Sequence, residues 1–384
     1  MLALGLYDSE VGFVATVFML SQVLFAFLSG PIIDKLGRRK ATAIFDFIAW
    51  SIPCLIWWRA ENFWYFLIAA FISGVTMIPS NAWDCLLIED AEKSEVTSIN
   101  TLVIVCAQLS VLFAPIAAVL FSRLTLVPAI RILYLNAFVL MTLKIVLLYI
   151  FSKETRMGKI RMEESRGKSL FSLLAGYGGV LKIVGKSRGT LFALVITAIV
   201  GIVAMINATF WPIIVNRKLL VPEYLLPMFP VFRSLIAITF LFLVIPRLTT
   251  GALKLPILTS LLCYFAGQTI LIFIPVDGFV KYPMLFVSLV FDGFGLGALL
   301  ALSRSLVALN VDPDERARVQ AILNMVVMAL TSPFGWIAGI LSGISRDFPF
   351  VLNLCFLAIG FLITFIYYLP GGASSKLQFL KKQP

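Results

Sequence analysis

Long apolar stretches alternate along this chain with short segments that carry charges, prolines or glycines. Each stretch is about 20 residues long, which is the length that a helix rising 1.5 Å per residue needs to cross a bilayer core of about 30 Å. The period-two alternation that is typical of membrane β-strands is absent. The pattern therefore predicts an all-α polytopic membrane protein with eleven visible transmembrane helices, over residues 12–33, 41–59, 62–84, 97–121, 128–151, 190–216, 225–245, 255–275, 284–306, 317–342 and 348–369.

The composition narrows the class of protein. Of the 384 residues, 60% are apolar and 13% are charged, whereas a soluble domain is about 45–50% apolar and about 25% charged. A soluble enzyme, a secreted disulfide scaffold and a disordered chain are therefore poor interpretations. The five cysteines form no CxxC pair, and the chain has no histidine. Because histidine-based catalysis and metal ligation are removed, we expect no enzyme activity, no metal and no cofactor.

The excess of basic residues predicts the orientation in the membrane. The chain has 31 Lys and Arg residues against 20 Asp and Glu residues. Of the 31 basic residues, 21 lie in one alternate set of loops and 6 lie in the other. The positive-inside rule then places the C-terminus and the central loop in the cytoplasm and the N-terminus outside the plasma membrane. On this interpretation the net charge indicates no nucleic-acid partner.

A long polar stretch divides the chain into two halves. We expect an N-terminal helical lobe of five helices over residues 1–151 and a C-terminal lobe of six over residues 190–370. Residues 152–189 are interpreted as a basic cytoplasmic linker, soluble in its first part and ending in a helix on the inner leaflet. Residues 371–384 are expected to form a cytoplasmic tail. Charged loops and helix prolines recur at similar offsets in the two halves, which suggests duplication.

A charged segment follows the first predicted helix. Residues 30–40, which we call the signature segment, have the form G-x-x-x-D-[RK]-x-G-R-R, with candidate gating residues Gly30, Asp34, Lys35, Gly37, Arg38 and Arg39. Glycine permits close helix approach and a tight reversal. Asp34 can face a helix N-terminus and pair with an arginine, and the basic residues can hold the segment at an anionic inner leaflet. The alternative is a plain positive-inside turn with an incidental aspartate.

The signature segment resembles the loop between the second and third helices of the major facilitator superfamily. The resemblance covers nearly the whole chain, through two helical halves, a basic central loop and a tail. It implies a two-lobe helical bundle, of twelve helices in the family, that carries a small solute by alternating access. The signature segment would then be a latch that stabilises the outward-open state. The implied partners are a small-molecule solute, the lipid bilayer and, in proton-coupled members, protons.

Two departures from the family pattern are visible. The signature segment follows the first predicted helix rather than the second, and residues 1–12 resemble the family's outer loop before helix two. We therefore expect family helix one to be missing, through a misplaced start or a truncation, and predict an apolar run of about 20 codons upstream. In addition, Ala70 stands where many proton-coupled members carry an arginine four residues before Gly74, which speaks against the drug/proton antiporter branch.

Two opposite charges are predicted to lie deep in the membrane. Arg233 and Asp292 each lie about eight residues, or roughly 12 Å, from the outer end of their helices. Ionisable groups at such depth are costly and are functional candidates by default. We expect an ion pair that lines the central cavity and binds substrate, carries a coupling proton on Asp292, or locks one state. The alternative is a static pair that only fixes helix packing.

Two further residues complete the candidate substrate or ion site. Asn207, with Phe210 and Trp211 on the same helix, is either a substrate contact or a hydrogen-bonding link between helices. Asp46 lies roughly 8 Å from the inner face. It is expected to pair with the arginines of the signature segment or to line the inner mouth, and it is a second candidate proton carrier.

The sequence thus predicts a secondary active transporter of a small solute. No GxxxxGK[ST] motif indicates ATP as the energy source, so we expect an ion gradient, with protons as the candidate. Two alternatives stay open. One is an inactive or truncated transporter-like membrane protein. The other is a membrane enzyme that acts on lipids, which is less favoured because the sequence offers no catalytic histidine or interfacial polar cluster.

Overall fold

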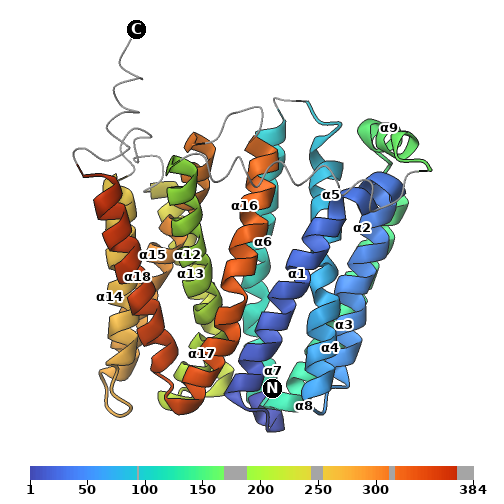
Figure 1. Cartoon of the computed structure of the whole chain (residues 1–384). Helices are drawn as coiled ribbons and strands as arrows, with labels where there is room; N and C mark the ends of the chain where they lie inside the picture. The colour runs from blue at the N-terminus through green and yellow to red at the C-terminus, as the bar shows by residue number, and fades with distance from the viewer. Residues whose placement is uncertain (93–94, 168–187, 244–253, 311–315, 370–384) are drawn as a thin grey trace. The chain divides into compact units, whose positions relative to one another are not determined.

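The computed structural model of the chain describes all residues except 93–94, 168–187, 244–253, 311–315 and 370–384 (Figure 1). The described residues form helices and short connections, with no strand among them. The chain divides into two compact units, Met1–Gly178 (unit 1) and Gly179–Pro384 (unit 2). The predicted inner-leaflet helix within the linker and the predicted tail over residues 371–384 lie outside the described residues.

Unit 1 is built from helices that begin and end at the following residues. They are η1 (Leu2–Leu4), α1 (Asp8–Leu36), α2 (Arg38–Asp46), η2 (Phe47–Ser51), α3 (Ile52–Trp58), α4 (Phe63–Ser73), η3 (Gly74–Thr76), α5 (Met77–Ile88), α6 (Val96–Ser110), η4 (Val111–Phe113), α7 (Ala114–Arg123), α8 (Leu126–Phe151) and α9 (Arg156–Glu164). The η2 segment is a π-helical turn, and α2, η2 and α3 form one continuous span. Helix α1 packs against α4 and α5, while α2 and α3 pack against α5 and α8.

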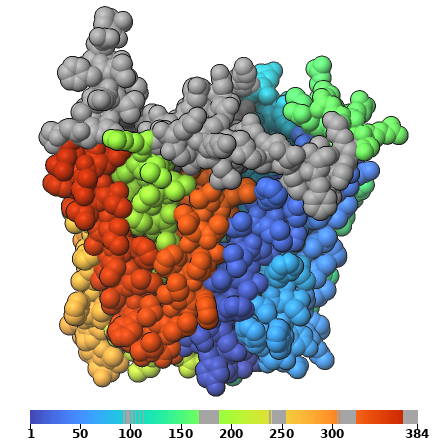
Figure 2. All heavy atoms as spheres, in the orientation of Figure 1, coloured from blue at the N-terminus to red at the C-terminus, as the bar shows by residue number. Residues whose placement is uncertain are grey.

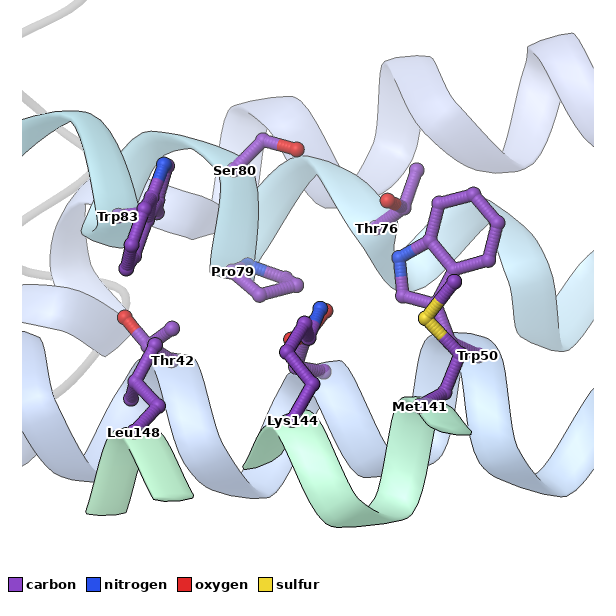
Figure 3. A pocket seen from close by; sticks show the side chains of 10 residues that line it. Thr42, Trp50, Thr76, Pro79, Ser80, Trp83, Met141, Lys144 and Leu148 are labelled. Atoms are coloured by element: carbon purple, nitrogen blue, oxygen red, sulfur yellow. The ribbon is translucent and has the colours of Figure 1, made fainter. Parts of the chain in front are cut away.

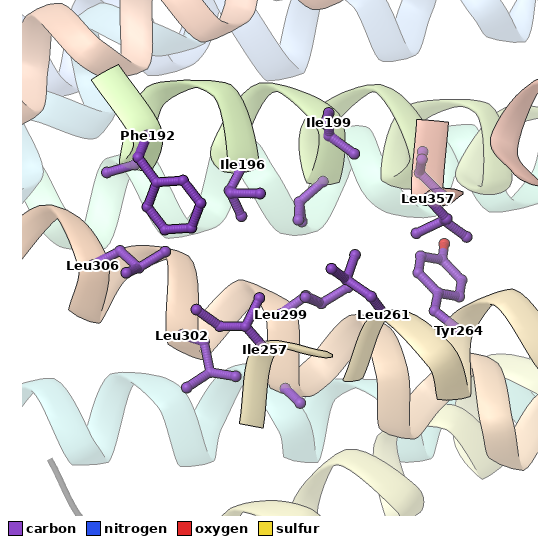
Figure 4. Packing of buried hydrophobic residues seen from close by; sticks show 14 of the residues in the cluster. Phe192, Ile196, Ile199, Ile257, Leu261, Tyr264, Leu299, Leu302, Leu306 and Leu357 are labelled. Carbon is purple, nitrogen blue, oxygen red and sulfur yellow. The ribbon is translucent and has the colours of Figure 1, made fainter. Parts of the chain in front are cut away.

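Unit 2 is organised around its first helix. Its elements are α12 (Arg188–Ile213), η6 (Ile214–Lys218), η7 (Glu223–Leu225), α13 (Met228–Leu243), α14 (Lys254–Ile272), α15 (Lys281–Asn310), α16 (Arg316–Thr331), α17 (Pro333–Ile344) and α18 (Phe348–Tyr367). Helix α12 packs against α15, α16 and α18, and α16, α17 and α18 cover much of the face of unit 2 seen in Figure 2. Figure 4 shows Phe192, Ile196 and Leu299 in the apolar core that forms around α12.

Local sequence sets several helix ends. The Asn62 side chain accepts a hydrogen bond from the Trp64 backbone N–H at 3.1 Å and thereby caps α4. Helices α17 and α18 carry proline in their first turn, where the missing N–H has no helical partner. These are the caps and starts that the residue types favour.

The all-α membrane fold is confirmed, but the number of spans differs from the prediction. Among the described residues, nine helices are long and apolar enough to cross a membrane. The stretch predicted over residues 97–121 is divided into α6, η4 and α7, with a proline at the start of α7. The stretch predicted over residues 225–245 contains the 16-residue helix α13 within the described part of the chain. The apolar pattern located both segments but did not predict the division of the first, and the end of the second lies outside the described residues.

Candidate functional site

The signature segment is a helix-to-helix junction rather than a loop. Its first part lies in the last turns of α1, a single residue follows, and Arg38 begins α2. That residue, Gly37, has φ 80° and ψ 162°, a conformation that L side chains rarely adopt. A Cβ atom at Gly37 would also lie 2.5 Å from Glu154 Oε2 and 2.8 Å from Met162 Sδ. The predicted tight reversal is therefore present, and the packing of the chain beyond α8 requires glycine there as well.

Arg38 is the centre of an ion-pair network in unit 1. Its side chain is buried, and Nη1 lies 3.1 Å from Asp34 Oδ1, while Nη2 lies 3.1 Å from Glu89 Oε1. Its Nε donates to both Glu89 oxygens at 3.2 Å. The structure thus brings together Asp34 and Arg38 of the signature segment and adds Glu89, which follows α5 and was not singled out from the sequence.

Glu154 connects the junction to the start of the linker. Its Oε1 accepts from the Arg38 backbone N–H at 2.9 Å, and its Oε2 accepts from the Arg39 backbone N–H at 3.0 Å. A carboxylate that accepts the first N–H groups of a helix satisfies donors that have no intrahelical partner. Glu154 therefore caps α2 from a position more than a hundred residues away in sequence.

The segment after Glu154 differs from the predicted soluble linker. Residues Arg156–Glu164 form α9, which packs against α1. The Thr155 hydroxyl donates to Glu89 Oε2 at 2.5 Å, and the Ser165 hydroxyl donates to the Asp34 carbonyl at 2.8 Å. The charged composition of α9 suggested a solvated segment, but polar residues at both of its ends bind it to the junction.

The remaining signature residues have different surroundings. The Arg39 guanidinium donates to the Tyr149 carbonyl and lies 4.3 Å from the centroid of the Tyr149 ring. Lys35 is exposed, and Gly30 is half-buried within α1. Arg38 therefore contacts Glu89, which follows α5, and Arg39 contacts Tyr149, near the end of α8. Lys35 does not contribute to the network.

Unit 2 contains a second set of buried polar residues. We call Asn207, Arg233, Tyr264, Gln268, Asp292 and Asn353 the polar cluster; these residues lie on α12, α13, α14, α15 and α18. Asp292 is 2% exposed. Its oxygens accept from Gln268 Nε2 at 2.9 and 2.8 Å and from Asn207 Nδ2 at 3.2 Å. A carboxylate inside a membrane helix is thus held by amide donors from two other helices.

Arg233 lies beside the Asp292 carboxylate but does not form a close bidentate ion pair with it. Its Nη2 lies 3.9 Å from Asp292 Oδ2 and 3.5 Å from Asn207 Oδ1. The guanidinium lies 4.4 Å from the centroid of the Trp211 ring, and its side chain is 29% exposed. The structure therefore brings together Arg233 and Asp292, which depth and charge had identified, and Asn207, which was identified as a polar residue within a membrane span.

Close packing of α14 and α15 positions the cluster. A Cβ atom at Gly295 would lie 2.6 Å from both the backbone N and Cβ of Tyr264, and one at Gly267 would lie 2.8 Å from the Asp292 backbone N. The Tyr264 hydroxyl accepts from Asn207 Nδ2 at 2.8 Å. Sequence reasoning did not identify Tyr264. Glycines on both helices were the available signal, because small residues let membrane helices approach closely.

The fourth predicted residue, Asp46, lies in unit 1. Its Oδ2 lies 2.5 Å from Lys144 Nζ rather than near the signature arginines. The pair lines a cavity of about 370 Å³ between α2, α5 and α8, together with Trp50 and Trp83. Figure 3 shows Lys144 rising from α8 toward Pro79 on α5. The expectation that Asp46 lines an opening therefore fits this geometry better than the expectation of a pair with the signature segment.

The two regions offer different chemistry. The polar cluster presents a carboxylate, amides and a partly exposed guanidinium, which suit binding of a polar solute or a proton. The junction network holds helix ends together through charge-assisted hydrogen bonds. Among the described residues, no group of three or more acidic or cysteine side chains is placed to hold a metal ion.

Comparisons with known proteins point to one family. Residues 1–255 match the sequence model of the Major Facilitator Superfamily, and no curated protein sequence matches the chain significantly. Three solved structures of similar fold are the nucleoside transporter NupG (12% identity, 95% of this chain and 91% of that chain, TM-score 0.67), the xylose transporter XylE from E. coli in an inward-open conformation (12%, 94% and 86%, 0.71), and a D-xylose-proton symporter (14%, 94% and 87%, 0.69). At these identities the likeness concerns the fold.

Proposed function

Because the chain belongs to the major facilitator superfamily, we propose that it is a secondary active transporter which moves a small solute across a membrane by alternating access. The solute binds at the polar cluster of unit 2. The observation that carries this assignment is the Asp292 carboxylate, which is buried among Gln268 and Asn207 while a partly exposed Arg233 lies beside it. Charged groups in membrane helices are costly, and such groups mark solute and ion pathways.

The junction network supplies the conformational control in this proposal. Arg38 joins α1 to the end of α5, and Glu154 joins the start of α2 to the segment before α9. A cluster of several charge-assisted hydrogen bonds stabilises the arrangement in which all of its partners meet. Transport requires two states that differ in such contacts. We therefore assign the network the role of a latch that favours one of the two states.

The proposed energy source is a proton gradient. Asp292 and Asp46 are carboxylates within membrane spans, each with a basic side chain beside it, Arg233 and Lys144 respectively. A carboxylate that gains and loses a proton changes its attraction to the neighbouring cation, and this couples protonation to packing. One of the similar folds is a D-xylose-proton symporter, which makes a proton the first coupling ion to examine.

Uptake into proteoliposomes tests the transport proposal. The full chain is reconstituted and uptake of xylose, uridine and solutes found by a thermal-shift screen is measured with and without an inward pH gradient. We expect gradient-stimulated uptake that falls at least about tenfold in Asp292→Asn and Arg233→Gln, because a hydrogen bond to a charged group contributes about 1.5–3 kcal/mol. The control is Asp277→Asn, whose side chain is exposed between α14 and α15.

Two results would contradict the proposal in different ways. Normal uptake by both Asp292→Asn and Arg233→Gln would remove the polar cluster from the pathway and leave a structural ion pair. Absence of uptake for every solute under every gradient would favour the transporter-like protein without transport activity.

We further propose that the signature segment, the central loop and the C-terminus lie on the cytoplasmic side of the plasma membrane. The distribution of basic residues supports this orientation. In a cysteine-free background, we expect Lys35→Cys to react with a membrane-impermeant maleimide only in permeabilised cells. Asp277→Cys, in the exposed connection before α15, should react in intact cells. The reverse pattern would invert the topology.

A further inference from the structure

Two buried N–H donors beside the polar cluster have no acceptor. Among the described residues, Arg233 Nε and Trp211 Nε1 are buried and form no hydrogen bond. Trp211 is only 3% exposed. The Arg233 guanidinium lies over the Trp211 ring, so the two donors belong to one place in the unit. Buried donors without acceptors are unfavourable and uncommon in folded proteins, and each calls for an explanation.

Asp292 does not use the hydrogen-bonding capacity of Arg233. Both Asp292 oxygens accept from Gln268, and one also accepts from Asn207. Arg233 Nη2 is 3.9 Å from the carboxylate, beyond hydrogen-bonding distance, and its hydrogen bond to Asn207 Oδ1 is 3.5 Å long. A guanidinium has five N–H donors. Arg233 therefore keeps donors for a ligand while its charge remains close to that of Asp292.

The groups without partners at Arg233 and Trp211 are donors rather than acceptors. Arg233 is partly exposed, so a ligand can reach its guanidinium. The indole N–H of Trp211 only donates. A buried acceptor without a partner, Asn353 Oδ1, belongs to a fully buried side chain on the other side of Gln268. A ligand group that only accepts hydrogen bonds would thus complement Arg233 and Trp211.

We propose that the transported solute carries an oxyanion, a carboxylate or a phosphate group, which accepts hydrogen bonds from Arg233 and Trp211. This inference rests on the proposed transport function and names the substrate class for the same site. Ionised oxyanions accept hydrogen bonds without donating them, and the planar fork of arginine matches two of their oxygens. Neutral sugars and nucleosides bring hydroxyl donors that these two side chains cannot accept.

Paired ligands of equal shape test the substrate class. Purified full-length protein in detergent is titrated calorimetrically with benzoate, with its uncharged counterpart benzamide, with phenyl phosphate and with inorganic phosphate. We expect saturable binding of benzoate or of the phosphate probes that weakens with salt, and no binding of benzamide. Preference between benzoate and the phosphate probes identifies which of the two oxyanions the site takes.

Two variants locate the binding. Trp211→Phe keeps an aromatic ring under Arg233 but removes the indole N–H, and we expect it to weaken anion binding about tenfold, since hydrogen bonds to charged groups are among the stronger ones. Arg233→Gln should abolish binding. The matched control is Trp64→Phe, an exposed tryptophan in unit 1, which should leave the affinity unchanged. Thermal unfolding of each variant confirms that it is folded.

Failure of this inference is distinguishable from failure of transport. Equal binding of benzamide and benzoate, no binding of any anion, or unchanged anion affinity in folded Trp211→Phe would each overturn the oxyanion assignment. Uptake of a neutral solute such as xylose that needs Asp292 but not Trp211 would keep the transport function and overturn the substrate class. Anion binding without any uptake would support the site and overturn the transport function.

Discussion

The two units differ in how deeply their apolar helices are buried. In unit 2, α12 packs against α15, α16 and α18, and 67% of its most apolar window is buried. In the described part of unit 1, α1 and α2 pack against α5, and α2 and α3 pack against α8. The most apolar window of α8 is only 6% buried, and its apolar side chains are largely exposed. The units therefore differ in how much of their apolar helices is buried.

The rest of the packing is similar. Helix α13 packs against α15 as α1 packs against α5, and α14 packs against α15 and α18 as α2 and α3 pack against α5 and α8. These parallels agree with the duplication that the spacing of charges and prolines suggested. The packing partners thus correspond between the units, while the buried share of the apolar helices differs.

The buried carboxylates of the two units also have different surroundings. Asp292 accepts hydrogen bonds from Asn207 on α12 and from Gln268 on α14. Asp46 lies at a cavity between α5 and α8, and its partner Lys144 has a side chain that is 47% exposed. The comparison teaches that amide donors from α12 and α14 enclose the Asp292 carboxylate, whereas Asp46 is paired with a lysine that is half exposed.

The largest expected effect separates these two polar sites. Gln268→Leu removes the amide nitrogen that donates both of the shorter hydrogen bonds to Asp292 and the oxygen that accepts from Asn353, so we expect a loss of about 3 kcal/mol in the free energy of unfolding. The double substitution Asp46→Asn/Lys144→Gln removes both charges of a pair whose Lys144 side chain is 47% exposed, and should cost under about 1 kcal/mol. Reversible unfolding in mixed detergent micelles measures both, and equal losses would contradict the comparison.

An intermediate effect tests the close approach of α14 and α15. Gly295→Ala would place a methyl group against the Tyr264 backbone, so overpacking should destabilise unit 2 by about 1–3 kcal/mol. The matched control lies two residues along the same helix, since a Cβ atom at Gly297 meets nothing within 4 Å. Gly297→Ala should be neutral or slightly stabilising because alanine favours helix. The melting temperatures of the two variants should differ accordingly, and indistinguishable values would count against the packing.

The smallest effect concerns the junction network of unit 1. Glu154→Gln replaces the carboxylate that caps α2, and we expect a loss of about 1 kcal/mol. Glu164→Gln is the control, because Glu164 forms an exposed pair with Arg161 at 3.0 Å. Protease sensitivity between α8 and α9, together with the melting temperature, reports whether the segment remains attached. A larger loss in the control than in Glu154→Gln would contradict the capping role.

The sequence predicted the features that depend on hydropathy and depth. Apolar runs located the helices, and the similar depth of Arg233 and Asp292 anticipated that they meet. The donors that hold Asp292 could not be predicted in the same way. Which amide reaches the carboxylate depends on how closely α14 approaches α15, and that approach is set by Gly267 and Gly295 together with their partners on the opposite helix.

The junction shows the same limit. Gly37 and the basic residues after it predicted a tight reversal, and this is a property of neighbouring residues. Glu154 lies 116 residues from Arg38 in the sequence. Its capping role therefore depends on the tertiary position of the end of α8, which the local sequence does not determine. Its charged neighbours resembled a solvated linker, because composition does not distinguish a surface helix that is anchored at its ends from one that is free.

The π-helical turn Phe47–Ser51 has a mechanical consequence for unit 1. A π turn is wider than an α turn and interrupts the regular hydrogen-bond ladder. This turn lies between α2, whose first N–H groups bind Glu154, and α3, which packs against α8. We expect a change in the orientation of α2 to be accommodated at this turn, just beyond Asp46, while α3 keeps its packing against α8.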